Sequence, residues 1–437
     1  MTDGVLGTAS PRLRRFLFSN QLASWAGQGI VSATNFAILI ILAHWARVED
    51  VGFYALGYSI LALAMVAQDS LVTRPYAIQM FKPPGGPEAH AYGTLAVAAL
   101  MAVATGLVLA GASVIMRMTG ADPALAGVVL MLAAAAPLAL TREFARRFSF
   151  ANLQMHQALV LDVAASALIV ALLLALALTG RLDAPMAFAA IGGAGSLCAL
   201  VWFMARRSFF RAMPGAVMQT ARQSWAFGKW LLASQITLQV QGYAAHWITA
   251  LVAGVAATGV YSACLSIVSL SNPFLFGLFN LLTPKFVRIL RDEGPRGLRR
   301  EAFRDALVIG AIMGAFTLVL YLGGGFLLAH LFPGKDFAGG TDVLSILALS
   351  SAVSALGAPA TIALSASERG RAIAALSFCA CVLGSAVVWL LLPRWGLPGA
   401  AFGMLATECL GTLARWALFL SGHNSSSPRP APAPARH

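Results

Sequence analysis

Long apolar runs recur along the whole chain and constrain its fold more than any other feature. A helix that crosses the hydrocarbon of a bilayer needs about 20 apolar residues. Twelve runs have about this length, at 18–44, 52–72, 91–116, 124–141, 158–179, 184–205, 230–253, 259–283, 306–329, 341–365, 372–392 and 397–421. Only helices and closed barrels satisfy the backbone in lipid, and these runs lack the alternating polarity of barrel strands. The sequence therefore predicts an all-α integral membrane protein with twelve transmembrane helices.

The composition excludes several classes of function. With 59% hydrophobic and 11% charged residues among 437, the chain has no room for a sizeable soluble catalytic domain. Its net charge of +13 does not indicate a nucleic-acid partner, because such an interface needs basic residues on an exposed domain. The sequence also lacks a GxxxxGK phosphate-binding loop, an HExxH motif and a DxD pair. We therefore expect a protein that is not an enzyme and has no cofactor.

The basic residues between the runs predict an orientation. Lys and Arg resist transfer to the outer face of a membrane. With the amino terminus inside, 25 of the 30 Lys and Arg residues fall on the cytoplasmic side and five fall outside, one per loop. We expect a multi-pass protein of the cell inner membrane with both termini in the cytoplasm. The predicted outer loops are all short, unlike the large external loop typical of membrane polymerases and ligases of surface glycans.

A two-fold repeat organises the runs. Six precede and six follow a basic stretch, and the segments VEDVGFYALGYSI at 48–60 and VAATGVYSACLSI at 255–267 are identical at five of thirteen positions. The aligned pairs include Gly52 with Gly259 and, at the same offset of 207, Gln28 with Gln235. Alternatively, the match arises by chance, because both segments are drawn from a chain of biased composition. Repeats with an even number of spans share one orientation, so a cleft between two lobes is the natural substrate site.

The predicted organisation follows from this repeat. Two six-helix bundles around a central cavity would have a linker between them and short segments at both ends. The expected parts are a cytoplasmic amino-terminal segment (1–17), a first bundle (18–205), a basic cytoplasmic linker (206–229), a second bundle (230–421) and a disordered cytoplasmic tail (422–437).

Polar side chains gather in the first run of each half, where they are costly in lipid. In the first run their spacing puts them on one helical face, and the seventh run repeats the pattern. These residues are Gln21, Ser24, Gln28, Ser32 and Asn35 in one run and Gln235, Gln239 and His246 in the other. They form either the wall of a hydrophilic cavity that contacts sugar hydroxyls or hydrogen bonds between helices.

Carboxylates within the runs have two interpretations. Asp69 lies five residues before Arg74, and Pro75 is expected to end the helix there. A local ion pair and a coupling-ion or gating role both remain open for Asp69. Glu408 and Arg415 are seven residues apart, so both project from one helical face as a charge relay or a neutralised pair. Asp162 has the same ambiguity.

The stretch TREFARRFSFANLQM at 141–155 combines arginines with phenylalanines. Arg142, Arg146 and Arg147 suit a diphosphate headgroup, because a guanidinium binds phosphate oxygens in pairs. The same composition is typical of an interfacial helix on anionic lipid.

The polar first run NQLASWAGQGIVSATNFAILIILAHWA, the segment VEDVGFYALGYSI, the pair Arg74 and Pro75, and TREFARRFSFANLQM together resemble polysaccharide exporters of the multidrug/oligosaccharidyl-lipid/polysaccharide (MOP) flippase superfamily. The resemblance covers nearly the whole chain, but its motifs are loose. It implies two six-helix bundles around a V-shaped cavity and movement of an undecaprenyl-diphosphate-linked oligosaccharide to the outer leaflet for surface polysaccharide biosynthesis. It also implies a cavity lined by Gln28, Asn35, Gln235, Gln239 and His246, with Arg74, Arg142 and Arg146 at the diphosphate.

Two alternatives accompany this expectation. A cation-coupled extruder of small molecules is the alternative within transport, and a membrane-embedded acyl- or glycosyl-transfer enzyme is the alternative from another class. For transport the expected partners are a lipid-linked oligosaccharide, membrane lipids, a proton or sodium ion for coupling through Asp69 or Glu408, and other membrane proteins of polysaccharide assembly.

Overall fold

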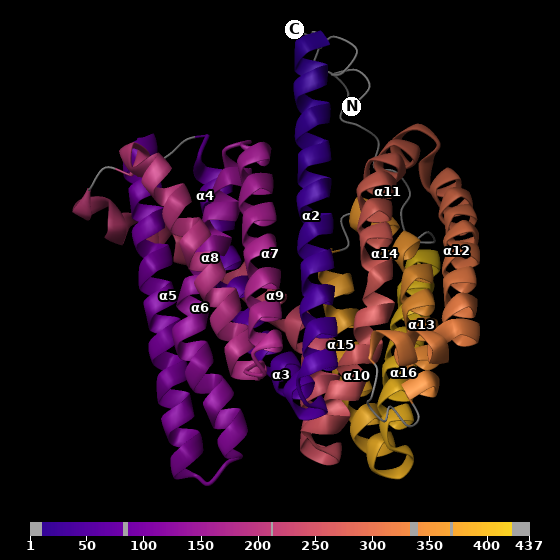
Figure 1. The fold of residues 1–437 in the computed structure, drawn as a ribbon. Coiled ribbons are helices and arrows are strands. Elements are labelled where there is room, and N and C mark those ends of the chain that lie inside the picture. Colours follow the sequence, from indigo (N-terminus) through magenta and orange to yellow (C-terminus); the bar gives the residue numbers. More distant parts are fainter. Residues whose placement is uncertain (1–10, 82–85, 211–212, 333–339, 368–369, 422–437) are drawn as a thin grey trace, which may run out of the picture. The chain divides into compact units, whose positions relative to one another are not determined.

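The structure is a computed structural model that describes residues 11–81, 86–210, 213–332, 340–367 and 370–421. Its regular elements within these ranges are helices (Figure 1). In the first part of the chain they are α2 (Pro11–Trp45), α3 (Val48–Gln68), η1 (Asp69–Thr73), α4 (Arg74–Gln79), α5 (Pro87–Met118), α6 (Pro123–Ala151), α7 (Met155–Leu178), α8 (Ala184–Arg206), η2 (Arg207–Phe209), α9 (Pro214–Ala253) and α10 (Val255–Val268). The remainder are η3 (Ser269–Ser271), α11 (Asn272–Asp292), α12 (Gly294–Leu331), α13 (Gly340–Leu356), α14 (Ala358–Ala366), α15 (Gly370–Trp395) and α16 (Leu397–Ser421). The tail at 422–437 lies outside the described residues.

Eleven helical segments within the described ranges are long and apolar enough to cross a membrane. The prediction of an all-α, multi-pass membrane protein is therefore confirmed. The run at 230–253 is the exception among the twelve, because it lies in α9, which is not one of the eleven. Its interruption by Gln235, Gln239 and His246 explains the lower hydropathy.

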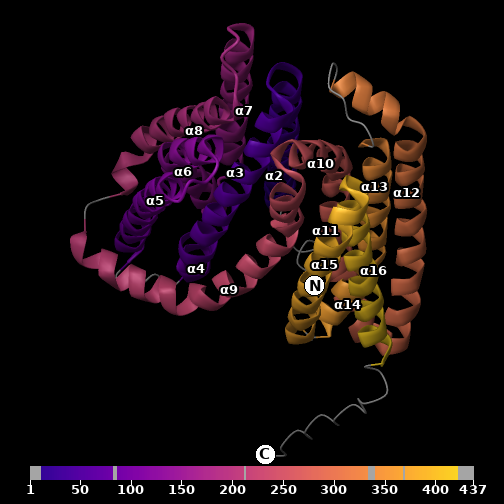
Figure 2. The same ribbon diagram turned by 90° about the horizontal axis from the view of Figure 1, so that it is seen from below.

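The chain forms two compact units. The first comprises residues 1–267 and 325–340, and the second comprises 268–324 and 341–437. The predicted linker at 206–229 lies within the first unit, where α9 begins at Pro214 and packs against α3, α4 and α5. Figure 2 shows α9 as a curved helix that passes around α4. The assignment of 230–421 to a second bundle stays a prediction.

Helix ends in the first unit carry local start signals. Asp122 and Asp183 cap α6 and α8, and their carboxylates accept hydrogen bonds from the backbone N–H groups of Ala124 and Met186, both at 2.8 Å. A proline follows each cap in the first turn, where it needs no hydrogen bond. These caps fix where two spanning helices re-enter the bundle.

The segment after α3 differs from expectation. Pro75 does not end the helix, because α3 passes through the short π-helical turn η1 into α4, with Pro75 in the first turn of α4. A proline is tolerated there, since the first N–H groups of a helix lack intrahelical partners. A π-helical turn inside a longer helix is uncommon and often lies at a functional site. Here it contains Asp69.

The two repeat segments contact each other within the first unit. A methyl group added at Gly52 would lie 2.8 Å from Val255 Cγ1, and one added at Gly259 would lie 3.3 Å from Val48 Cγ1. The contact is symmetric, because the offset of 207 that aligns Gly52 with Gly259 also aligns Val48 with Val255. Glycine is needed at both positions for this close approach of α3 and α10.

The second unit has a hydrophobic core of its own. Phe286, Met313 and Phe419 are buried there on α11, α12 and α16. Lys285 bridges from α11 to α12, with its Nζ 2.8 Å from Glu301 Oε1 and 2.9 Å from Asp305 Oδ2. The basic stretch at 285–304 thus forms the end of α11 and the start of α12, which this bridge holds together.

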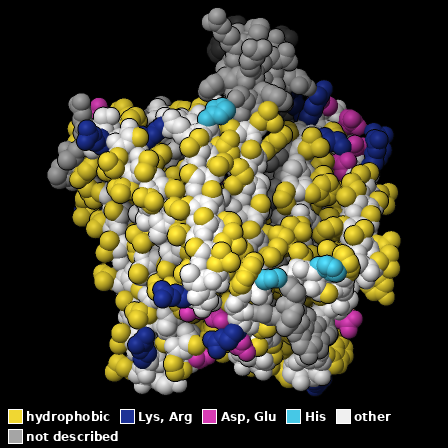
Figure 3. All heavy atoms as spheres, in the orientation of Figure 1, with side chains coloured by type: hydrophobic (Ala, Val, Ile, Leu, Met, Phe, Trp, Pro, Cys, Tyr) yellow, Lys and Arg dark blue, Asp and Glu magenta, His cyan; other side chains and the backbone are white. Residues whose placement is uncertain are grey.

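Hydrophobic side chains cover much of the visible surface along the helices, whereas charged side chains gather toward the helix ends (Figure 3). Many large apolar residues are exposed, among them Leu107 and Val108 on α5 and Leu200 on α8. A water-soluble protein rarely exposes contiguous apolar surface on this scale. This distribution is what a hydrocarbon environment requires.

Candidate functional site

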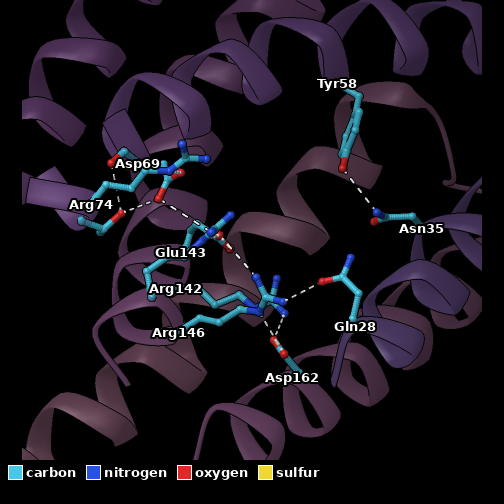
Figure 4. A network of polar contacts seen from close by, with 11 residues as sticks. Gln28, Asn35, Tyr58, Asp69, Arg74, Arg142, Glu143, Arg146 and Asp162 are labelled. Carbon is cyan, nitrogen blue, oxygen red and sulfur yellow. Dashed lines mark hydrogen bonds and ion pairs between the residues drawn. The ribbon is translucent and has the colours of Figure 1, made fainter. Parts of the chain in front are cut away.

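A network of arginines and carboxylates occupies the first unit, and α6 is its scaffold (Figure 4). The arginine-rich stretch continues α6 as helix to Ala151, so Arg142 and Arg146 lie one turn apart on one face. Both reach Asp162 of α7. Arg142 Nη2 is 2.7 Å from Asp162 Oδ1, and Arg146 Nε is 2.9 Å from Asp162 Oδ2.

The network continues along α6 to η1. Glu143 Oε1 lies 2.6 Å from Arg147 Nε and 3.5 Å from Arg146 Nη1, so it joins the two arginines. Arg147 Nη1 in turn lies 3.7 Å from Asp69 Oδ1. Asp69 Oδ1 also accepts a hydrogen bond of 2.7 Å from the Thr73 hydroxyl, which holds this carboxylate in the π-helical turn.

Arg74 ends the network at α9. Its Nε is 2.6 Å from Asp69 Oδ2, which makes the local ion pair that the sequence leaves open. With the Gln235 amide oriented so that its oxygen accepts, this oxygen lies 2.9 and 3.2 Å from the two terminal nitrogens of Arg74. The guanidinium is thus held between η1 and α9.

Cations and anions alternate along this network. In order they are Arg74, Asp69, Arg147, Glu143, Arg146, Asp162 and Arg142. The four arginines exceed the three carboxylates by one formal positive charge. Asp162 has no exposed side-chain surface, whereas the side chains of Arg74 and Arg147 are 42% and 40% exposed. The end of the network at η1 is therefore the part that a solute can reach.

The predicted cavity residues divide into two groups. Gln28 and Gln235 join the network, since Gln28 Oε1 accepts a hydrogen bond of 3.3 Å from Arg146 Nη2. These two glutamines are equivalent in the repeat, and each accepts from an arginine. Asn35 instead donates to the Tyr58 hydroxyl at 3.3 Å.

The other predicted cavity residues lie along α9. Gln239 is half-buried, one turn from Gln235. His246 is buried, with its ring edge-on to that of Tyr261 at a centroid distance of 5.2 Å, and Tyr243 lies close by. His246 therefore packs against two tyrosine rings. The cavity role of all five residues stays a prediction.

Glu408 and Arg415 form an ion pair in the second unit. Their seven-residue spacing places both on one face of α16, with Arg415 Nη2 3.6 Å from Glu408 Oε2. Arg415 Nη2 also donates to the Thr412 hydroxyl at 3.0 Å. A coupling or gating role for Asp69 and Glu408 stays a prediction, and each has a guanidinium partner.

Sequence reasoning missed the two carboxylates that organise the network. The sequence pattern does not distinguish Glu143 from other charged residues, and it leaves the role of Asp162 open although Asp162 pairs with two arginines at once. The available signal was that Asp162 is the one charged residue in the run at 158–179. A lone carboxylate in a spanning helix usually has a cationic partner on another helix. Among the residues that the structure describes, no group of three or more His, Cys, Asp or Glu side chains could hold a metal ion.

No known family model matches the sequence, and no curated protein sequence does either. Solved structures match it closely in fold. One is the inward-facing conformation of a multidrug resistance MATE family transporter of the MOP superfamily, with a TM-score of 0.73 and 14% identity over 90% of this chain and 96% of that chain. The outward-facing conformation of such a transporter has a TM-score of 0.63 and 14% identity, over 92% and 93% of the two chains.

A third similar structure comes from Pyrococcus furiosus. It is a MOP superfamily transporter whose binding pocket has reverse polarity, which suggests a different function for that protein. Its TM-score is 0.64, with 12% identity over 92% of this chain and 94% of that chain. At these identities the likeness establishes the fold alone. The chain therefore has the fold of MOP superfamily transporters, and the polysaccharide exporter branch stays a prediction.

Proposed function

We propose that this chain is a secondary transporter of the MOP superfamily that moves its substrate across a membrane by alternating access. The observation that carries the proposal is the fold, which matches a MATE transporter over 90% of this chain. Similar structures are described as inward-facing and outward-facing, as alternating access requires. The polar network supplies the polar groups within the bilayer that such a transporter needs.

The first candidate function is extrusion of small molecules coupled to a cation. It is the alternative kept in the sequence analysis, and the solved structures favour it because they include multidrug transporters. Asp69 and Glu408 are the proposed coupling carboxylates for a proton or sodium ion. Because each is paired with an arginine, binding of the cation would have to compete with a guanidinium.

The second candidate is flipping of a lipid-linked oligosaccharide, and a specific observation favours it. The network has one more arginine than carboxylates, and a diphosphate is the kind of anion that a guanidinium fork binds. Arg142 and Arg146 form ion pairs with Asp162 and are mostly buried. Among the proposed diphosphate ligands, Arg74 is therefore the one most exposed to a headgroup. The binding pocket of the Pyrococcus furiosus protein is described as having reverse polarity. This supports the view that transporters with this fold differ in the charge of the substrate they carry.

The two candidate functions share one expected location in the cell and differ in their expected partners. Both functions place the chain in the cell inner membrane with both termini in the cytoplasm, as the distribution of Lys and Arg favours. Oligosaccharide flipping would add the other membrane proteins of polysaccharide assembly as partners.

Transport by the purified chain in proteoliposomes tests the proposal. One set of vesicles contains a fluorescent small molecule, either cationic or anionic, and carries a proton or sodium gradient. A second set contains an undecaprenyl-diphosphate oligosaccharide with a fluorescent sugar, whose exposure is measured by an impermeant quencher. Gradient-dependent efflux supports extrusion, and protein-dependent loss of protected fluorophore supports flipping. If neither the rate of efflux nor the rate of flipping exceeds the rate in protein-free vesicles, the proposal is wrong.

A further inference from the structure

A cavity on the side of the first unit opens to the surface between two helices. Both α5 and α6, and α6 and α8, pack closely together, and a cavity of about 450 Å³ lies between the three helices. Its floor contains Phe144 and Trp202, which are buried. Its rim contains Ala99 on α5, which is exposed, and Leu197 and Leu200 on α8, which are each 54% exposed. This lateral cavity is therefore accessible from the hydrocarbon that surrounds the helices.

The lining of the lateral cavity favours an apolar occupant. Its residues, within the described ranges, include no Asp, Glu, Lys or Arg. The hydroxyls of Thr141 and Ser196 donate to backbone carbonyls of their own helices, at 2.6 and 2.9 Å. Gln68 also lines the cavity, but it is 1% exposed and offers almost no surface to an occupant. A charged or polar group would lose its hydration here without compensation, so the cavity suits a hydrocarbon chain.

Two arginines lie at the end of α8, next to the lateral cavity. The guanidinium carbon of Arg206 is 5.5 Å from the centre of the Trp202 ring, which forms part of the cavity floor. Arg206 also donates a hydrogen bond to the side-chain oxygen of Gln154, an uncharged partner. Arg207 follows and is exposed. Among the residues that the structure describes, neither arginine pairs with a carboxylate, unlike the arginines of the network. Their charge therefore favours an anion from outside the chain.

The lateral cavity and the two arginines together span about one leaflet. Ser196, which lines the cavity, lies ten residues before Arg206, the last residue of α8. At 1.5 Å per residue this distance is about 15 Å, which is half of the roughly 30 Å of hydrocarbon in a bilayer. A lipid with its phosphate at Arg206 would thus place an acyl chain along the cavity. In the predicted orientation this end of α8 is cytoplasmic, where anionic lipids give the leaflet its negative surface potential.

We propose that the lateral cavity binds an acyl chain of an anionic membrane phospholipid, whose phosphate pairs with Arg206 and Arg207. A guanidinium donates hydrogen bonds to phosphate oxygens in pairs, so the arginines select the headgroup. The apolar lining holds the chain. The site is independent of the transported substrate, so it stands or falls separately from the proposed function.

Photolabelling of the full-length protein in phosphatidylcholine nanodiscs tests the proposal. The probe is phosphatidylglycerol with a diazirine at the end of one acyl chain, and labelled residues are identified by mass spectrometry. We expect saturable labelling of cavity residues on α5, α6 or α8. Unlabelled phosphatidylglycerol should compete at least about fivefold better than phosphatidylethanolamine, because only the former carries a net negative charge.

Variants at the end of α8 test the headgroup contacts. Arg206→Gln combined with Arg207→Gln should weaken competition by phosphatidylglycerol about tenfold and remove its advantage over phosphatidylethanolamine. The matched control is Arg222→Gln, which removes an exposed arginine of α9 on the same predicted side of the membrane and should leave the labelling unchanged. Equal competition by the two lipids, or a preference that survives in the double variant, would overturn the proposal.

Variants at the rim test the acyl-chain contacts independently of the arginines. Ala99→Trp fills the mouth of the lateral cavity from an exposed position and should abolish saturable labelling. Leu107→Trp adds the same ring at an exposed α5 residue that does not line the cavity and should have no effect. Labelling that does not saturate, or that survives Ala99→Trp, would overturn the proposal. Competition by undecaprenyl diphosphate at lower concentrations than phosphatidylglycerol would also overturn it, because the cavity would then be a substrate site.

Discussion

Replacing Asp162 with asparagine removes the charge at the most buried point of the arginine network. The side chains of Arg142 and Arg146 are only 14% and 9% exposed, and both are paired with this carboxylate. Removing one partner of a buried ion pair typically costs about 3–5 kcal/mol, because an uncompensated charge is left behind. Asparagine keeps the size and one acceptor oxygen, so we expect Asp162→Asn to lower the free energy of unfolding by about 3 kcal/mol.

The loss can be measured by denaturant titration of the purified protein in mixed micelles. Asp292→Asn is the matched control, since Asp292 pairs with Arg288 at 3.5 Å on an exposed surface and should lose less than about 1 kcal/mol. Adding Arg142→Gln to Asp162→Asn should recover part of the stability, because one stranded guanidinium is then removed. A loss no larger than that of the control, with no recovery in the double variant, would refute the electrostatic reasoning.

Three further variants test other contacts. Gly52→Ala should destabilise the protein by about 1–3 kcal/mol in the same titration, because its methyl group would overlap α10; Gly193→Ala, with open space around it, should be neutral or stabilising. Trp247→Phe should cost about 1 kcal/mol, since Trp247 Nε1 donates to the buried Ser59 hydroxyl at 2.9 Å, and an unchanged midpoint would contradict this. Arg74→Lys should slow transport in proteoliposomes, because the half-exposed guanidinium fork is lost. It should change the free energy of unfolding by less than about 1 kcal/mol, because the charge remains. Transport at the wild-type rate would exclude a role for the fork.

Much of the fold could be predicted because hydrocarbon imposes simple rules on a spanning chain. Runs of about 20 apolar residues and the need to satisfy the backbone are enough to place helices. The repeat was also informative, since the aligned glycines Gly52 and Gly259 occupy equivalent places in one symmetric contact. Helix ends were harder to predict, because α6 and α9 continue well into stretches rich in charge. In such stretches the length of an apolar run does not indicate where the helix begins or ends.

The site was only partly predictable. The arginine-rich composition of the stretch at 141–155 grouped Arg142 with Arg146, and spacing along one helix correctly grouped Glu408 with Arg415, because residues on one face stay together. It could not reveal that Asp162, 16 residues beyond Arg146, would bind both arginines, since that contact depends on how α6 packs against α7. Likewise, Pro75 suggested a helix end, whereas the π-helical turn before it lets the helix continue.

Cysteine accessibility at position 239 tests the central claim of alternating access most directly. Gln239→Cys would be introduced into protein whose five native cysteines, Cys198, Cys264, Cys379, Cys381 and Cys409, are replaced by alanine. The variant would be treated in oriented vesicles with an impermeant maleimide from each side. Alternating access predicts reaction from both sides, with an imposed ion gradient raising the rate on one side and lowering it on the other. Reaction from a single side under every condition, or none from either, would contradict it.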